Sequence, residues 1–215
     1  MRIGRAILMT LFILSLAACG GDDDTPATPV PGGGGQTAPA ADVPALTQTV
    51  QTTGSSGALT LSYPETWSAA ALDSIVISED SRVVALLEQA GRLPVLDTVP
   101  AVAFAALIGP NTVAAFNIAA DAPIIEVLVA YTGGAARQEA LSEMKPFDAA
   151  GRSAVVVIVP GSYSTLTAEN VVSLVDVGSG SYAAITLTAP VGKGAQYEAL
   201  VRAITASITF TPASG

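Results

Sequence analysis

Residues 170–187 read NVVSLVDVGSGSYAAITL. Two apolar, β-branched runs, 170–177 and 181–187, flank Gly178-Ser179-Gly180, a short glycine-rich turn of the kind that joins neighbouring strands. The pattern predicts a β-hairpin. Because the two strands of a hairpin run antiparallel, the segment indicates a sheet that is largely antiparallel.

A second hairpin is predicted directly upstream. Residues 141–147 and 153–159 flank Asp148-Ala149-Ala150-Gly151-Arg152, which has the composition of a turn. Around residue 60, apolar Leu59, Leu61 and Tyr63 alternate with hydroxyl side chains, as in a strand with one buried face. The strands expected before the hairpins cover residues 58–63, 74–78 and 101–108.

Helical periodicity is clearest near the C-terminus, where one apolar face recurs at helical spacing. That face is formed by Tyr197, Leu200, Val201, Ile204 and Ile208. An earlier helix is expected over 81–90, begun by Asp80 or Ser81 and closed by Gly91, with the stripe Val83, Leu86, Leu87 and Ala90. A third has Asp121 as its cap, Pro123 in its first turn and the stripe Ile124, Val127, Leu128 and Tyr131. Mixed helices and hairpins predict an α+β fold, with helices packed on the sheet.

The N-terminal residues have the pattern of an export signal. Arg2 and Arg5 precede the apolar run 6–18, which is shorter than the ~20 residues that a spanning helix needs. The run ends in Leu16-Ala17-Ala18-Cys19, which resembles the lipobox of bacterial lipoproteins, and Cys19 is the only cysteine. The resemblance implies that Cys19 carries the lipid, that cleavage precedes it, and that the mature chain lies outside the cytoplasm on the cell membrane or outer membrane. The alternative is an ordinary signal peptide or membrane anchor with a stray cysteine.

The chain is therefore expected to have three parts: a signal peptide (1–18), a tether (19–45) and one α+β domain (46–215). Residues 20–45 consist almost entirely of Gly, Pro, Ala, Thr and Asp, which cannot bury enough apolar area to offset the entropy of ordering. A flexible segment of this length reaches roughly 28 Å. The acidic run 22–24 is interpreted as solvating the tether, since no calcium-binding loop pattern follows it.

Several motifs in the domain resemble, in order, those of PsbP-like proteins. They are Leu-Ser-Tyr-Pro-Glu-Thr-Trp at 61–67, the short strand at 74–78, Gly151-Arg152-Ser153-Ala154, the hairpin over 171–187, and a closing segment from Tyr197 to Ile208. The resemblance covers roughly 57–211 and implies an antiparallel sheet sandwiched between helices. Because members of that family act mainly by docking on other proteins, it also implies a protein partner, but it carries over no binding residue.

The residue types present exclude much of the usual catalytic chemistry. The chain has no histidine, so histidine-based triads and histidine metal sites are excluded. Lys145 and Lys193 are interpreted as surface charges, and Gly161-Ser162-Tyr163-Ser164 lacks the glycine of a nucleophile elbow. We predict no enzyme activity, no catalytic residue, no cofactor and no metal. The carboxylates left as candidates for a convergent pair are Glu79, Asp80, Asp97, Asp121, Glu126, Glu169 and Asp176.

The net charge of −9 argues against nucleic-acid binding. Three functions remain. The first is a non-enzymatic module, anchored by Cys19, that docks on an extracytoplasmic protein. The second is a lipid-binding or small-molecule-binding lipoprotein with a pocket between sheet and helices, against which a tightly packed interior would count. The third is a carboxylate hydrolase, with or without a metal. Trp67 could stack on a ligand, although packing against the core beside its turn is the favoured interpretation.

Overall fold

The computed structural model describes residues 43–119, 121–133 and 143–213, which form two antiparallel sheets and four helices. This confirms the predicted α+β class and the largely antiparallel pairing. Residues 1–42, which include Cys19, the predicted signal peptide and most of the predicted tether, lie outside the described residues. No helix among the described residues is long and apolar enough to cross a bilayer.

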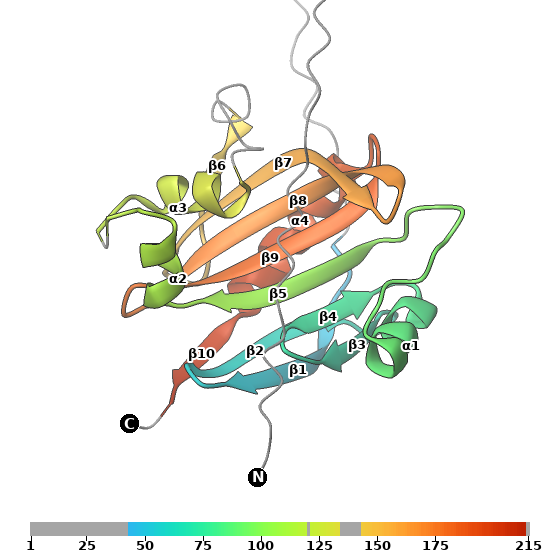
Figure 1. Ribbon diagram of the computed structural model, residues 1–215, viewed down its shortest axis with the longest axis horizontal. Helices are drawn as coiled ribbons and strands as arrows, with labels where there is room; N and C mark the ends of the chain where they lie inside the picture. Colours follow the sequence, from blue (N-terminus) through green and yellow to red (C-terminus); the bar gives the residue numbers. More distant parts are fainter. Residues whose placement is uncertain (1–42, 120, 134–142, 214–215) are drawn as a thin grey trace, which may run out of the picture. The chain divides into compact units, whose positions relative to one another are not determined.

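The larger sheet has seven strands in the order β3-β4-β5-β9-β8-β7-β6, and every neighbouring pair is antiparallel (Figure 1). Its centre is the long hairpin predicted from residues 170–187, which extends further at both ends than the sequence indicated. The strands are β3 (Ser68–Ala71), β4 (Ile75–Ser78), β5 (Val102–Ile108), β6 (Lys145–Asp148), β7 (Ser153–Tyr163), β8 (Leu166–Gly178) and β9 (Ser181–Pro190).

The smaller sheet has the order β1-β2-β10 and brings the start and end of the domain together. Its strands are β1 (Leu46–Gly54), β2 (Gly57–Pro64) and β10 (Thr209–Pro212). In β2 the alternation holds as predicted, since Leu59 and Leu61 are buried while Thr60 and Ser62 are half-buried. The sequence analysis did not identify β1, β3 or β10.

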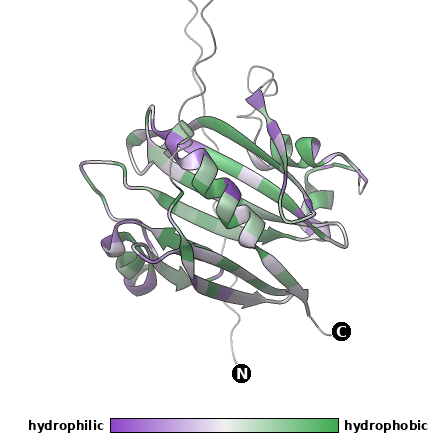
Figure 2. Cartoon of the chain, turned by 180° about the vertical axis from the view of Figure 1, so that it is seen from behind, coloured by the Kyte–Doolittle hydropathy of each residue, from purple (hydrophilic) through white to green (hydrophobic). Residues whose placement is uncertain are grey.

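Helices lie on both faces of the larger sheet (Figure 1), as the predicted sandwich requires. Helix α4 (Gly194–Ser207) and the smaller sheet pack on one face of the larger sheet. Figure 2, which views the domain from the opposite side to Figure 1, shows α4 lying across the strands. Helices α1 (Ser81–Ala90), α2 (Pro110–Ala115) and α3 (Ile124–Tyr131) pack on the other face. The predicted apolar face of α4 is buried through Leu200, Val201, Ile204 and Ile208.

Alternation along the strands divides the core into layers. On β7, Ala154 and Val156 face α4, whereas Val155 and Val157 face the layer of α2 and α3. Both layers contain fully buried aliphatic side chains, as expected of a packed interior. This packing argues against the interior lipid pocket that the second functional hypothesis required.

Two helix boundaries test the sequence rules. In α1, the Asp80 side chain accepts a hydrogen bond from the Arg82 N–H at 3.0 Å and Gly91 has a φ of 62°, as predicted. In α3, the prediction that Asp121 caps the helix is wrong. Pro123 takes the extended N-cap conformation, with φ −55° and ψ 142°, so the helix starts at Ile124 and Asp121 lies two residues before the cap.

Candidate functional site

The outer edge of β1 is the first candidate site, and the hydrogen-bond alternation of the smaller sheet defines it. The Ala213 N–H donates to the Ser56 carbonyl at 3.2 Å, which continues the β10–β2 ladder. Antiparallel partners alternate between hydrogen-bonded and non-hydrogen-bonded pairs. The even-numbered residues of β2 therefore bond to β10 and the odd-numbered ones to β1. By the same alternation, Thr49, Gln51 and Thr53 of β1 direct their N–H and C=O groups away from β2.

Among the described residues, β1 pairs only with β2, so these outward groups form an unpaired edge. The side chains of Thr49, Gln51 and Thr53 are exposed, whereas the inward-facing Val50 packs against the core. The Thr52 hydroxyl donates to the Leu72 carbonyl at 2.8 Å and ties the inner side of the strand down. The edge is thus held in place while its outer groups remain available.

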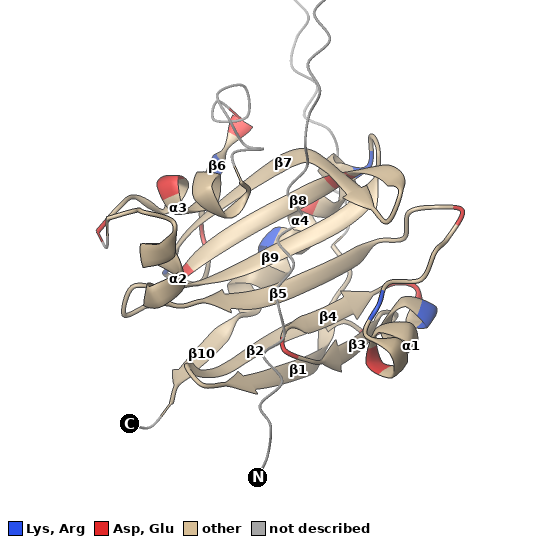
Figure 3. Ribbon diagram, in the orientation of Figure 1, with Lys and Arg blue, Asp and Glu red and all other residues tan. Residues whose placement is uncertain are grey.

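The outer face of the same sheet is uncharged and rich in hydroxyl groups. None of the residues of its three strands is charged, and in Figure 3 these strands are tan throughout. We call this surface the threonine face. It is formed by Thr49, Gln51, Thr53, Ala58, Thr60, Ser62, Thr209 and Thr211.

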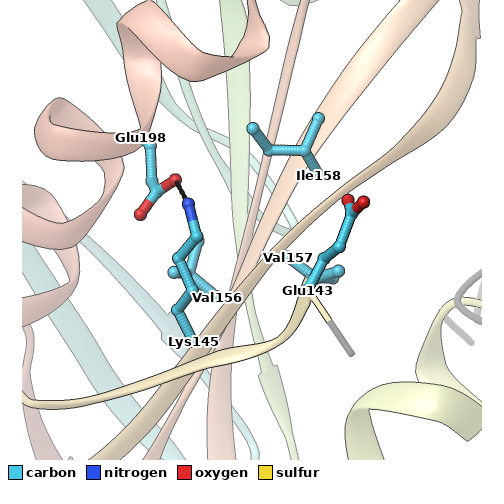
Figure 4. Close-up of a pocket in the computed structure, with 6 residues that line it drawn as sticks. All are labelled: Glu143, Lys145, Val156, Val157, Ile158 and Glu198. Carbon is cyan, nitrogen blue, oxygen red and sulfur yellow. Dashed lines mark hydrogen bonds and ion pairs between the residues drawn. The ribbon is translucent and has the colours of Figure 1, made fainter. Parts of the chain in front are cut away.

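A groove of about 300 Å³ between β6, β7 and α4 is the second candidate (Figure 4). Lys145 and Glu198 form an ion pair of 2.6 Å on one side of it, with Glu143 on the other and Val156 and Ile158 between the strands and the helix. Glu198 also accepts from Arg202 at 2.8 Å. Burial alone would raise the pKa of Glu198, but the hydrogen bonds from Lys145 and Arg202 together hold it below its usual value.

Lys145 was interpreted as a surface charge, and its side chain is 56% exposed in the ion pair with Glu198. The Arg202 guanidinium stacks at 4.6 Å over the ring of Phe147 and continues the network. These two cations pair with the half-buried carboxylate, and because Lys145 lies on β6 and Glu198 on α4, the arrangement ties β6 to α4. Both carboxylate oxygens of Glu198 are engaged, Oε2 by Lys145 and Oε1 by Arg202.

A second groove of about 300 Å³ opens beside the turn that follows β2. Trp67 and Tyr197 form its aromatic wall, with ring centroids 6.4 Å apart and an interplanar angle of 66°. Trp67 is 9% exposed and belongs to the core, as favoured from the sequence, and yet it lines the groove. The remaining lining residues are Val43, Pro44, Glu79, Gln196, Ala199 and Leu200.

The other residues singled out from the sequence are dispersed. Lys193 is exposed at the start of α4, and Ser162 lies on the β7 side of the β7–β8 hairpin. Glu169 accepts a hydrogen bond from the Gly194 N–H, and Asp80 pairs with Arg82. No group of three potential metal-ligating His, Cys, Asp or Glu side chains occurs in the part of the chain that the structure describes.

Sequence reasoning singled out Trp67, Glu79 and Lys145 individually but brought none of them together, and it missed strand β1 entirely. The run Leu46–Gly54 is rich in threonine, a residue favoured in strands, and Gly54-Ser55-Ser56-Gly57 follows it as a turn. That signal could have identified β1. Nothing local links Glu79 to Tyr197, which lie 118 residues apart and meet only in the fold.

Comparisons with known proteins assign no family. No protein-family model matches the chain, and no curated protein matches it. Among solved structures, it is similar to LpqN of Mycobacterium tuberculosis, described as involved in cell envelope biogenesis. The TM-score is 0.45 and the identity 16%, over 77% of this chain and 91% of LpqN. A Bacteroides thetaiotaomicron protein gives a TM-score of 0.37 and 13% identity, over 71% of this chain and 45% of the other. The PsbP-like resemblance stays a prediction.

Proposed function

We propose that this protein is a lipid-anchored extracytoplasmic lipoprotein whose domain is a non-enzymatic docking module, and that an extended segment of a partner protein adds to the sheet at β1. The sequence around Cys19 and the composition of residues 20–45 support the anchor and the tether. The unpaired β1 edge supports the docking mode. In strand addition the main-chain hydrogen bonds supply affinity, while side chains supply specificity.

The comparison of the four sheet edges carries this proposal. Native proteins protect exposed edges by making them short or by placing charges and proline on them. Strands β3, β6 and β10 each have four residues; β6 carries Lys145, Pro146 and Asp148, and β10 ends at Pro212. Strand β1 has nine residues and neither a charge nor a proline. Its single irregularity is a bulge between Leu46 and Gln48, which leaves 48–54 as a regular template.

The threonine face lies next to the β1 edge and adds an uncharged surface that a partner could also contact. The cores of protein interfaces are depleted in charged residues. The chain has 27 charged residues by its Lys, Arg, Asp and Glu content, and none of them lies on β1, β2 or β10. A strand added at β1 would continue the sheet beside this uncharged face. The absence of histidine and the neutralised Glu198 favour docking over catalysis.

The test is a site-specific crosslink in native membranes. A photocrosslinking residue replaces Gln51 in the full-length lipoprotein, and in a matched control it replaces Gln89, which is exposed on α1. We expect one partner protein to crosslink from position 51 and not from position 89. The Gln51→Lys variant should abolish that product when the crosslinker is moved to Thr49, whereas Gln89→Lys should leave it unchanged. The Cys19→Ser variant tests the anchor and should leave the chain unlipidated and released from the membrane.

Two outcomes would contradict docking of a partner protein at β1. Crosslinks between two copies of this chain would show that β1 mediates self-association. Equal labelling from positions 51 and 89 would show that the edge has no preferred partner. A Cys19→Ser protein that is still cleaved and membrane-bound would contradict the lipid anchor alone, independently of the docking result.

A further inference from the structure

We infer that the groove beside Trp67 binds a trimethylammonium group, carried either by a free solute or by a lipid headgroup. The inference is independent of strand addition at β1, because it rests on a different part of the domain. Three features of the groove support it: the aromatic wall, one carboxylate held in a fixed orientation, and the apolar residues that form the rest of the lining.

The aromatic wall has the form of a corner. The planes of Trp67 and Tyr197 are inclined by 66°, and the 6.4 Å between their centroids lies toward the long end of the range for contacting rings. A cation near an aromatic face is attracted by the negative face of the ring, most strongly for tryptophan. Trp67 is fixed by its burial and by the hydrogen bond from its backbone N–H to the Pro64 carbonyl at 3.0 Å. The corner is therefore formed before any ligand arrives.

Glu79 supplies the countercharge. Its Oε1 accepts from the Ala101 N–H at 3.0 Å, and its Oε2 accepts from the Tyr197 hydroxyl at 3.3 Å. These two bonds orient the carboxylate, which is nevertheless exposed. No Lys or Arg among the described residues forms an ion pair with it, in contrast to Glu198 in the other groove. The Trp67 groove thus has an oriented negative charge that is not neutralised.

The rest of the lining favours a methylated cation over a primary one. A primary ammonium has three hydrogen-bond donors to satisfy. The side-chain acceptors of the lining are the Glu79 carboxylate, the Gln196 amide oxygen and the Tyr197 hydroxyl, and both Glu79 oxygens already accept hydrogen bonds from the protein. Val43, Pro44, Ala199 and Leu200 present apolar groups that suit methyl groups. An apolar cavity of ~150 Å³ holds a benzene-sized molecule, so a groove of about 300 Å³ accommodates a group of that size.

The protonation of Tyr197 is compatible with this role. Burial raises the pKa of Tyr197, and the adjacent Glu79 carboxylate raises it further. The phenol therefore remains neutral at physiological pH and keeps donating its hydrogen bond to Glu79.

The test uses the fluorescence of Trp67, which is the only tryptophan in the chain. The full-length protein is kept in a maltoside detergent, whose headgroup has no ammonium, and is titrated with choline chloride. A parallel titration uses 3,3-dimethylbutan-1-ol, the uncharged carbon analogue of choline. We expect a saturable change with choline and at least about tenfold weaker binding of the analogue. Sodium chloride at matched ionic strength corrects for salt.

Three variants of the groove residues and one control variant separate the contributions of Glu79 and Tyr197. Glu79→Gln should weaken choline binding about tenfold, and Tyr197→Leu should weaken it by a similar factor. Tyr197→Phe keeps the ring and should lose less than Tyr197→Leu. Glu143→Gln removes a carboxylate from the other groove and should bind like the wild type. Because Glu79 is exposed, its substitution tests the site even if Tyr197→Leu fails to fold.

A third titration, with glycerophosphocholine, distinguishes a lipid headgroup from a free solute as the source of the trimethylammonium group. Binding at least as tight as that of choline would support a lipid headgroup as the ligand, and binding of choline alone would support a free solute. The inference is overturned if choline gives no saturable response, if the uncharged analogue binds equally well, or if Glu79→Gln and Glu143→Gln behave alike.

Discussion

Glu169 on β8 caps the N-terminus of α4: its Oε2 accepts a 2.7 Å hydrogen bond from the backbone N–H of Gly194. Lys193, at the N-cap position, makes no side-chain hydrogen bond to the helix. The carboxylate therefore satisfies one N–H of the first turn and places negative charge at the positive end of the helix dipole. Since α4 carries Tyr197 and Glu198, this contact helps to fix the helix that lines both grooves.

Glu169→Ala is expected to lower the free energy of unfolding by about 1–2 kcal/mol, because it removes a cap and a favourable charge. Glu169→Gln keeps an oxygen that can accept the bond and should lose less. Urea unfolding followed by circular dichroism measures both. Equal stability of all three proteins would show that water replaces the carboxylate at no cost.

Gly194→Ala is expected to destabilise the domain by about 1–3 kcal/mol through overpacking. A Cβ at this position would lie 2.7 Å from Glu169 Oε2 and 2.9 Å from Ile158 Cγ2. Alanine is the better helix former, so propensity alone predicts a gain. Gly54→Ala is the control, because its Cβ would meet nothing within 4 Å. A more stable Gly194→Ala protein would show that α4 can move away from β8 without penalty.

Local patterns were sufficient for the elements whose determinants lie close together in the chain. Helix α1 has its cap, its apolar positions and its closing glycine within twelve residues, from Asp80 to Gly91. The hairpin of β8 and β9 has its turn between the paired runs. Even in α1, the buried residues differ from the predicted apolar stripe. Val84 is buried and Ala90 is exposed, because the helix packs with Val83 and Val84 toward the sheet.

Long-range determinants could not be obtained from one sequence. The cap of α4 comes from a residue 25 positions away, and the Trp67 groove joins segments from both ends of the domain. Strand β1 lacks the apolar alternation that would identify it, since only Leu46 and Val50 among its residues are aliphatic. Its strand conformation depends on pairing with β2. Apolar periodicity therefore does not reveal this edge, and only its threonine content and the turn that follows it indicate a strand.

Tyr163→Phe is expected to leave the stability unchanged or to raise it by up to about 1 kcal/mol. The Tyr163 ring packs with Val76, Val83 and Val102 and is 1% exposed, but its hydroxyl has no hydrogen-bond partner among the described residues. Phenylalanine keeps the packing and removes the unsatisfied group. Thermal and urea unfolding measure the change. A loss greater than 1 kcal/mol would indicate that the hydroxyl is hydrogen-bonded in solution, for example to a buried water.

The Lys145–Glu198–Arg202 network makes stability depend on pH in a predictable direction. In the folded protein the pKa of Glu198 lies below its usual value of 4.5, because the two cations outweigh the opposing effect of burial. The contribution of ionised Glu198 to the free energy of unfolding is therefore complete above pH 4.5. It is lost as the pH falls through the lower pKa of the folded state.

Glu198→Gln should accordingly lower the free energy of unfolding by about 1 kcal/mol at pH 7. The value is modest because Lys145 is mostly exposed. The difference from the wild type should persist down to about pH 5 and shrink below pH 4.5 as Glu198 becomes protonated in the wild type too. Urea unfolding of both proteins from pH 7 to pH 3 provides the measurement. Glu143→Gln is the control, because Glu143 lies in the same groove and forms no ion pair with another described residue. A difference that grows toward low pH would have the wrong sign and would exclude the network as the cause.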